Sequence, residues 1–399
     1  MLFLYPCCDI YITIMSKGQA ATRSDPTAIT APSLGELTLY FLRLGALGFG
    51  GPIALVGYMH RDLVERERWV SEQEYREGLA FSQLAPGPLA AQLAMYLGLI
   101  RGGFAGATLV GTAFILPSFL MVVALAVLYT HYGGLSWIQA SFYGIAPAVI
   151  AVIAQAVLKL VKTTVGRDPL LWVVFVVLAA STAISEREIV WLFLGSGIVC
   201  AGVRGRSSPP AGLLPGLFLL TSLPGSGKLL EVFLFFAKAG LFVFGSGLAI
   251  VPFLHGGVVQ EHQWLSERQF LDAVAVAMIT PGPVVITVGF IGYLVAGFWG
   301  AVAAAAGVFL PVYLVTLFLG RSYRDWSRSE MVRTFVAGVT AAAAGAMAGA
   351  MVVLGKRAML DVPTLAIGIV SLIAVLRFKI PEPLLIVGAG LAGILLYPN

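Results

Sequence analysis

The sequence predicts an all-α polytopic membrane protein, built from two homologous repeats with broken helices and about 10 to 12 membrane segments. Three observations predict this class. Apolar residues make up 59% of the chain and charged residues only 11%, whereas a soluble domain carries roughly 25% charged residues. The apolar residues lie in blocks of about 17 to 28, the length of a membrane-spanning helix, without the alternation of a barrel. The third observation is an internal duplication.

The duplication starts from FGGP at Phe49 to Pro52, which recurs as FGSG at Phe244 to Gly247, 195 residues later. The same offset relates Arg43 to Lys238, Gly45 to Gly240, His60 to His255, Glu72 to Glu267, Glu77 to Asp272, and Pro86-Gly87-Pro88 to Pro281-Gly282-Pro283. After a deletion the offset becomes 194, which pairs Pro117 with Pro311. So many ungapped identities indicate two copies of one unit.

The predicted organisation is a disordered tail at 1–36, a first repeat at 37–203, a connector rich in proline, glycine and serine at 204–230, and a second repeat at 231–399. Each repeat contains five or six apolar segments. The loop THYGGLSW in the first copy has no Lys or Arg, whereas the second copy carries Arg321, Arg324, Arg328 and Arg333 there. Because basic residues collect in cytoplasmic loops, this contrast favours inverted repeats. The loops after the fourth segments are basic in both copies and weaken that argument.

The net charge of +5 comes without a basic stripe or patch, so we expect no nucleic-acid partner. The cysteines at 7, 8 and 200 and the histidines at 60, 131, 255 and 262 do not cluster. We therefore expect no metal site, no disulfide framework and no cofactor.

A proline-glycine-proline sequence interrupts an apolar segment in each copy, at Pro86-Gly87-Pro88 and Pro281-Gly282-Pro283. Proline removes a backbone donor, so each helix should break and leave polar groups for an ion. The amides that follow each break would lie at the positive end of a helix dipole. A packing kink without a ligand is the alternative. The side chains expected to add contacts to the ion are Gln83, Gln92, Thr280 and Thr287.

The glycine-rich segments form a second candidate group, which comprises Gly50, Gly51 and Pro52 in one copy and Gly245 and Ser246 in the other. They fit either a ligand contact or close helix packing. Arg43 and Lys238 are basic residues inside apolar runs. Charge within a membrane is costly, so the pair predicts an anion site facing a shared cavity, unless both side chains extend to the interface.

Four ionisable residues recur beside these motifs and are candidates for carrying a coupling proton: His60, Glu77, His255 and Asp272. Histidine titrates near neutrality, and burial would raise the pKa of a carboxyl group. Simple positioning at the interface is the alternative for each of them. Ser71 with Glu74, and Ser266 with Gln269, fit capping boxes that start the helices leading to the breaks.

The stretch LGFGGP followed by WVSEQEYREGLAFSQLAPGP, with its echo FGSG and WLSERQFLDAVAVAMITPGP, resembles the chromate ion transporter family in its long, two-domain form. The resemblance covers the chain beyond the tail, and the second copy departs from it at Ser246-Gly247. It implies a multi-pass secondary transporter of the cytoplasmic membrane that exports chromate and confers resistance. Chromate is a tetrahedral dianion similar to sulfate, and free amides with basic side chains suit such an ion.

The partners implied are the lipid bilayer and chromate or a sulfate-like oxyanion, and the sequence leaves homo-oligomerisation open. No nucleotide-binding domain is present, so uphill transport would use the proton motive force. The alternatives are a carrier of sulfate or another oxyanion, an anion channel, or an intramembrane enzyme. The enzyme is disfavoured because HExxH, GxSxG and paired intramembrane aspartates are missing from the sequence.

Overall fold

A computed structural model describes residues 32–186, 190–204, 227–243, 247–320, 329–378 and 380–397, and these residues form helices and turns without a strand. The first copy contains α2 (Leu34–Leu47), α3 (Gly51–His60), η2 (Arg61–Arg66), α4 (Glu72–Leu84), α5 (Leu89–Tyr132), α6 (Ser136–Leu160), η3 (Val161–Val165), α7 (Pro169–Ser185) and α8 (Val190–Arg204). The second contains α10 (Lys228–Leu241), η4 (Gly247–Ala249), α11 (Ile250–Leu254), η5 (His255–Glu261), α12 (Glu267–Ile279), η6 (Val284–Ile286), α13 (Thr287–Leu319), α15 (Glu330–Ala358), α16 (Val362–Phe378) and α17 (Glu382–Leu396). Residues 1–31 of the predicted tail lie outside the described residues. Helix α2 begins at Leu34, within the last residues of the range 1–36 that was predicted as the tail.

The helices have the length and composition of membrane segments. Four are long and apolar enough to span a bilayer: Leu89–Tyr132, Ser136–Val165, Val284–Leu319 and Glu330–Ala358. Four shorter apolar helices accompany them in the described part of the chain. Large side chains face outward, among them Phe318 at 74% and Leu395 at 84% exposure. Such an apolar exterior is stable in lipid, so the protein is an all-helical membrane protein.

The longest helices, α5 and α13, each fold back on themselves near their start. The backbone is non-helical at Gly102 and Gly103 in α5, and at Ala296 and Gly297 in α13. A β-carbon at Gly98 would lie 2.8 Å from the carbonyl carbon of Gly106, eight residues later, and only a sharp reversal brings these backbones together. The break predicted in the segment that contains Pro86-Gly87-Pro88 is confirmed. This segment consists of two short helices, α4 and the first part of α5.

These two short helices form a hairpin with Pro86-Gly87-Pro88 at its tip. Phe81 near the end of α4 stacks on Tyr96 of α5, with ring centroids 5.5 Å apart, so the chain reverses at the break. The chain also reverses after α2 at its glycine-rich segment. The hydroxyl of Tyr40 in α2 donates to Asp62 in η2, and the ring centroids of Tyr40 and Trp69, which follows η2, lie 6.4 Å apart. Proline explains the break, because it supplies no donor to continue the helix.

The predicted capping boxes are confirmed at the start of the breaking helices. Ser71 accepts a hydrogen bond from the amide of Glu74, and the Glu74 carboxylate accepts from the amide of Ser71 at 2.9 Å. Ser266 and Gln269 repeat this arrangement at the start of α12. The boxes satisfy amides that a helix start leaves free, and they fix where each hairpin begins.

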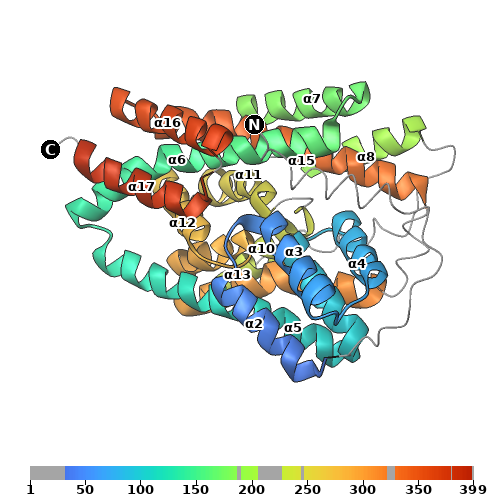
Figure 1. Cartoon of the computed structure of the whole chain (residues 1–399). Helices are drawn as coiled ribbons and strands as arrows, with labels where there is room; N and C mark the ends of the chain where they lie inside the picture. Colours follow the sequence, from blue (N-terminus) through green and yellow to red (C-terminus); the bar gives the residue numbers. More distant parts are fainter. Residues whose placement is uncertain are drawn as a thin grey trace.

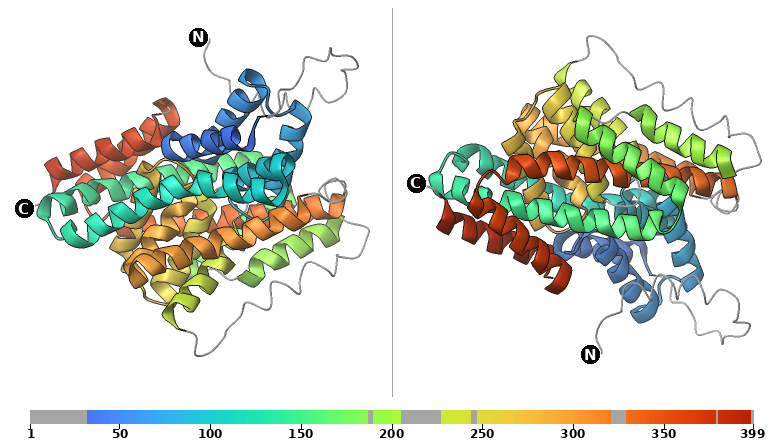
Figure 2. Two further views of the ribbon diagram at one scale, coloured as in Figure 1. Left: turned by 90° about the horizontal axis from the view of Figure 1, so that it is seen from below. Right: turned by 90° about the horizontal axis from the view of Figure 1, so that it is seen from above.

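The two copies exchange helices. In Figure 1, α6 and α15 run between α7 and α16 on one side and α2 and α5 on the other. The first copy's α6 packs on α16 and α17 of the second, and α15 of the second packs on α7 and α8 of the first. Both views in Figure 2 keep α8 beside α15 and the last two helices beside α6. The repeats are therefore intertwined, with one shared core.

Candidate functional site

The tips of the hairpins meet across the two copies. The amide of Gly87 donates to the carbonyl oxygen of Val243 at 2.8 Å, and the amide of Gly282 donates to the carbonyl oxygen of Gly48 at 2.8 Å. Gly87 and Gly282 are equivalent in the duplication, and so are Gly48 and Val243. The two hydrogen bonds are therefore one contact made twice. Each proline-glycine-proline tip is held by the glycine-rich tip of the other copy.

Small residues allow these tips to approach closely. Gly87 has φ of 141° and Gly282 has φ of 94°, which glycine adopts readily. A β-carbon at Gly87 would lie 2.7 Å from a methyl group of Val312, and one at Gly282 would lie 3.0 Å from Cβ of Ser118. Val312 and Ser118 are again equivalent positions. The predicted glycines of the breaks are thus required by the close packing of the two copies.

The glycine-rich segment of the first copy lies at the same junction. Gly50 has φ of 109° and Gly51 has φ of 71°, and α3 begins there with Pro52 in its first turn. A β-carbon at Gly247 would lie 3.5 Å from Cγ of Pro52, so the segments of the two copies are in contact. Gly245 and Ser246 lie outside the described residues.

The first break presents free polar groups. Leu89, Ala90 and Ala91 open α5, and their amides make no hydrogen bond outside their own helix in the described part of the chain. Gln92 is fully buried, and its Nε2 donates to the carbonyl oxygen of Pro86 at 3.0 Å. The Oε1 atom of Gln92 has no hydrogen-bond partner within the parts of the chain that the structure describes. The sequence suggested that Gln92 adds a hydrogen-bond donor to the ion site. In the structure its donor, Nε2, is used within the break, and its free atom, Oε1, is an acceptor.

The second break uses more of its own polar groups, although the amides of Val284 and Val285 also make no hydrogen bond in the described part of the chain. Its chain continues through a short 3₁₀ turn, in which the amide of Ile286 donates to the carbonyl oxygen of Pro283 at 2.9 Å. The hydroxyl of Thr287 donates to the carbonyl oxygen of Val284 at 2.8 Å, and that of Thr280 donates to Ala277 at 3.1 Å. Both hydroxyls are therefore bound within their own segment.

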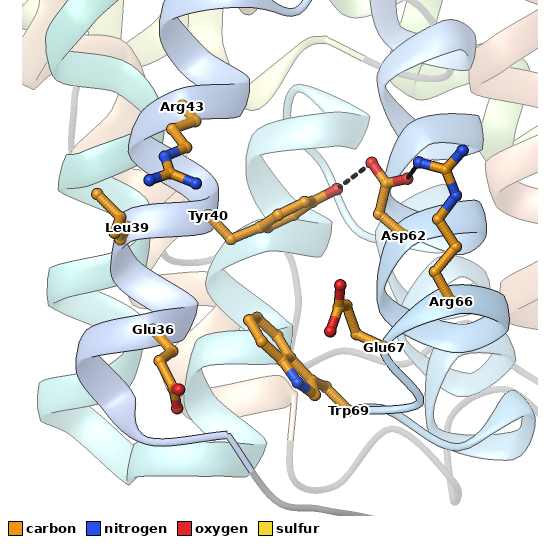
Figure 3. Close-up of a pocket in the computed structure, with 8 residues that line it drawn as sticks. All are labelled: Glu36, Leu39, Tyr40, Arg43, Asp62, Arg66, Glu67 and Trp69. Carbon is orange, nitrogen blue, oxygen red and sulfur yellow. Dashed lines mark hydrogen bonds and ion pairs between the residues drawn. The ribbon is translucent and has the colours of Figure 1, made fainter.

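Arg43 lies on the outer face of α2. It is exposed and lines a surface pocket of about 350 Å³ between α2 and the segment that follows α3. The other residues that line this pocket are Glu36, Leu39, Tyr40, Asp62, Arg66, Glu67 and Trp69. Figure 3 shows Asp62 bonded to Tyr40 and Arg66, whereas Arg43 makes no hydrogen bond or ion pair among the described residues.

Lys238 is half-buried, and its ammonium lies 6.0 Å from the ring centroid of Phe253. Arg43 and Lys238 were expected to face a shared cavity. Among the described residues, they do not line one cavity. Arg43 opens to the surface pocket, while Lys238 lies against an aromatic ring. A cation beside an aromatic face is stabilised without an anion.

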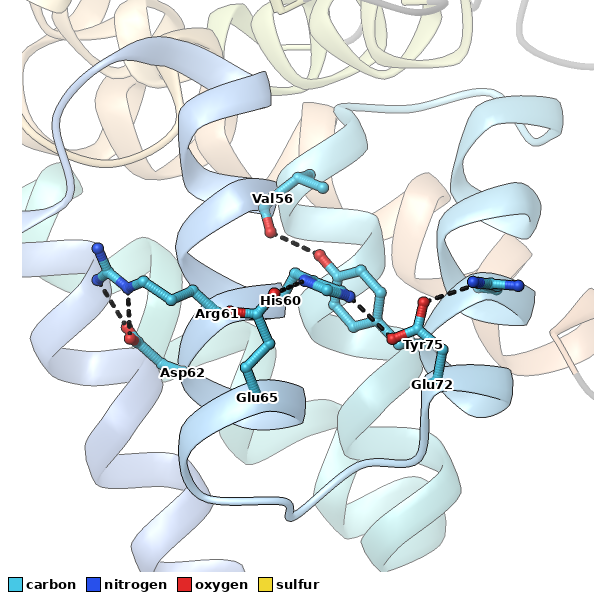
Figure 4. Close-up of polar contacts among 8 residues, drawn as sticks. Val56, His60, Arg61, Asp62, Glu65, Glu72 and Tyr75 are labelled. Atoms are coloured by element: carbon cyan, nitrogen blue, oxygen red, sulfur yellow. Dashed lines mark hydrogen bonds and ion pairs between the residues drawn. The ribbon is translucent and has the colours of Figure 1, made fainter. Parts of the chain in front are cut away.

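His60 and His255 each pair with a glutamate that begins the next helix. His60 Nε2 lies 2.9 Å from Glu72 Oε2, and His255 Nε2 lies 2.8 Å from Glu267 Oε2. Nδ1 of His60 also lies 3.2 Å from Oε1 of Glu65, and Figure 4 shows this contact. In the second copy Glu267 further pairs with Arg357 of α15. These contacts hold the base of each hairpin.

Asp272 is buried at 4% exposure, and its Oδ2 accepts a hydrogen bond from the hydroxyl of Tyr129 at 2.7 Å. Tyr129 belongs to α5 of the first copy and Asp272 to α12 of the second, so this pair connects the copies. The equivalent Glu77 is half-buried and lies one turn from Gln73, whose Nε2 donates to it at 3.0 Å. Asp272 is thus the more buried of the two acids.

Several site residues were not predicted from the sequence. Glu72 and Glu267 recur in the duplication, and their pairing with the equivalent histidines could have been inferred from that recurrence. Ser118 donates to the carbonyl oxygen of Gly45 at 3.0 Å beside the second break. Ser118 and Tyr129 lie on the long part of α5, and their roles depend on how this helix packs against the other copy, so no local pattern reveals them.

A family model described as chromate transporter matches residues 35–201 and 230–394. A chromate transport protein of Cupriavidus metallidurans is 54% identical over 384 residues, which cover 92% of this chain and 95% of the relative. A probable chromate transport protein of Synechococcus elongatus is 55% identical and covers 92% and 96%. A chromate transport protein of Pseudomonas aeruginosa is 31% identical and covers 95% and 96%. No solved structure matches the chain. The relatives are transporters rather than enzymes, and this chain belongs to the chromate transporter family.

Proposed function

We propose that this protein exports chromate across the cytoplasmic membrane, driven by the proton motive force, and so gives resistance to chromate. The names of its relatives and the matching family model support the substrate. Chromate is an anion, so an interior-negative membrane potential favours its outward movement.

The first break is the proposed ion site. One observation carries this assignment: the three amides of Leu89 to Ala91 open a buried helix without acceptors outside it, beside the unpartnered Oε1 of Gln92. Free amides and the helix dipole favour an anion, and burial strengthens the interaction because water does not compete. The glycine-rich tip of the second copy holds the first break in place, through the hydrogen bond from the amide of Gly87 to the carbonyl oxygen of Val243.

Asp272 is the proposed carrier of the coupling proton. It is buried, and its partner Tyr129 belongs to the other copy. A movement of one copy against the other would change this contact, which would link protonation to the exposure of the ion site. The two histidines are less suited to this role, because each is held by a glutamate at the base of its hairpin.

Accumulation of radiolabelled chromate in everted vesicles tests the function. The expected result is accumulation that requires energised vesicles and is abolished by a protonophore. Passive conductance without coupling would instead identify a channel. The absence of any energised accumulation would refute the proposal.

Sulfate has the same shape and charge as chromate and remains the main alternative substrate. Competition by sulfate and molybdate in the same vesicles separates the two. Stronger transport of sulfate than of chromate would show that chromate is only an incidental substrate.

We also propose that the repeats are inverted. The exchange of α6 and α15 between the copies and the crossed hydrogen bonds at the tips support a two-fold relation. Single cysteines at Gly134 and Ser329, which follow equivalent long helices, should react with an impermeant thiol reagent from opposite sides of the membrane. Reaction from the same side would show parallel repeats.

A further inference from the structure

The side chain of Gln92 is oriented by the backbone of the first break. Its Nε2 donates to the carbonyl oxygen of Pro86 at 3.0 Å. Turning the amide over would place Oε1 against that carbonyl oxygen, and two acceptors repel each other. The position of Oε1 is therefore fixed, and a β-carbon at Gly87 would lie 3.2 Å from it. This oxygen lies inside the break, beside the start of α5.

Oε1 of Gln92 finds no donor among the described residues around it. Pro86 and Pro88 have no amide hydrogen, and the amide of Gly87 is already bonded to Val243. Gln92 itself is fully buried, and Oε1 is one of only two side-chain atoms in the described residues that are buried without a partner. A buried acceptor without a donor is destabilising, because it has given up its hydrogen bonds to water and gained none in return. A ligand with a donor would remove this penalty.

The same site also attracts a negative charge, because the amides of Leu89 to Ala91 are donors without acceptors outside their helix. A ligand that satisfies both groups must be an anion that carries a hydrogen. A dianion such as sulfate or fully ionised chromate offers acceptors only, and would leave Oε1 of Gln92 against a negative oxygen. A singly protonated oxyanion offers three acceptor oxygens and one hydroxyl donor.

We propose that the first break binds a tetrahedral oxyanion carrying one proton, such as hydrogen chromate, whose hydroxyl donates to Oε1 of Gln92 while its other oxygens accept from the amides of α5. This rests on the proposed function and specifies the form of its substrate. Each exported ion then carries one proton outward. The net number of protons that enter per ion is one fewer than the number carried inward by the protein.

Ionisable groups of the protein could also produce a dependence on pH. Those on the hairpin itself and on the elements that pack on it include Glu72, Glu74, Tyr75, Arg76 and Glu77 on α4, Tyr96 and Arg101 on α5, Arg43 on α2, His60 on α3, Asp272 on α12, Tyr313 on α13, and Lys356 and Arg357 on α15. None of them bonds to Pro86–Gln92 in the described part of the chain. The experiment must nevertheless separate protonation of the ion from protonation of the protein.

Equilibrium binding of radiolabelled chromate to the purified full chain, measured on both sides of the pKa of hydrogen chromate, tests the inference. Above that pKa the affinity for total chromate should fall about tenfold per pH unit, because only the protonated ion binds. Selenate, a dianion over the same range, should bind weakly at every pH. If the affinity for selenate also falls about tenfold for each unit by which the pH is raised, a group on the protein titrates and the inference is wrong.

The Gln92→Leu variant should bind weakly at low pH and lose most of the pH dependence. Thr340→Val, which removes a buried hydroxyl bonded only to Val336 within α15, is the matched control and should keep the wild-type slope. If Gln92→Leu fails to fold, the comparison of chromate with selenate in the wild type still decides. Binding of chromate that is independent of pH would overturn this inference and leave the proposed function intact. No binding of either ion, with no energised transport, would overturn both.

Discussion

The two proline-glycine-proline breaks share a backbone and differ in what they leave free. Both place glycine at positive φ at the tip of a hairpin, and both donate one amide to the other copy. The first is followed directly by an α-helix and buries an unpartnered oxygen of Gln92. The second is followed by a 3₁₀ turn in which Thr287 bonds to Val284. Duplication has kept the architecture of the breaks while their polar side chains diverged.

This difference suggests that both breaks stabilise the fold, whereas the first break binds the ion. The crossed hydrogen bonds need both breaks, so damage to either should disturb the fold. Both breaks leave amides free, but the unpartnered buried side-chain acceptor belongs to the first, so changes to side chains should affect transport unequally. The following predictions test this division.

Gly282→Ala should have the largest effect. A β-carbon there would lie 3.0 Å from Cβ of Ser118 and 3.1 Å from the carbonyl oxygen of Gly45, and the positive φ costs about 1–3 kcal/mol more. The amount of folded protein extracted from membranes, measured by size-exclusion chromatography, should fall strongly. Gly87→Ala should be milder, because the obstacle there is the side chain of Val312. Gly388→Ala, with nothing within 4 Å, is the control. Equal amounts for all three variants would contradict the close approach of the tips.

Gln92→Leu should reduce chromate transport by roughly 10- to 100-fold, since a hydrogen bond to a charged ligand contributes about 1.5–3 kcal/mol. Thr287→Val should reduce it only a few-fold, because the hydroxyl is bonded within its own segment. Initial rates in vesicles, normalised to protein amount, provide the comparison. Equal losses in the two variants would mean that both breaks bind the ion.

Asp272→Asn should lower energised accumulation to the level seen with a protonophore, while exchange of labelled for unlabelled chromate continues. The amide keeps the size of the side chain but cannot take up a proton. Glu77→Gln should have less effect, because Glu77 is only half-buried. Loss of exchange in Asp272→Asn would show a structural role, and loss of coupling in Glu77→Gln would move the proton site to the first copy.

Arg43→Ala should have the smallest effect, less than about fivefold on transport, because an exposed charge contributes little. Transport rates at matched membrane abundance are the measurement. A larger loss of transport, with a normal amount of the variant in the membrane, would show that Arg43 contributes to binding or moving the ion. Lys238→Met, measured beside it, tests the equivalent cation.

Much of the fold could be predicted because its signals are local. Apolar blocks, double prolines and the capping residues Ser71 and Ser266 each act through nearby backbone. The duplication also shows that His60 and His255 are equivalent positions, and this follows from the sequence alone. By contrast, the expectation that Arg43 and Lys238 share a cavity came from the cost of charge inside apolar runs and from their equivalent positions. Equivalent positions have the same place on a helix, but what they face depends on neighbours that have changed.

The sequence by itself determined that this is a duplicated helical membrane protein with a break in each copy, because composition, repetition and proline act without reference to the rest of the fold. Only the tertiary structure decided that the tips cross between the copies, that the chain reverses at Gly102 and Gly103, and that Gln92 faces the break with an acceptor. Those features depend on hydrogen bonds and packing between segments far apart in the chain. A local pattern can show that a polar group is free, but packing decides which atom of that group is left for a ligand.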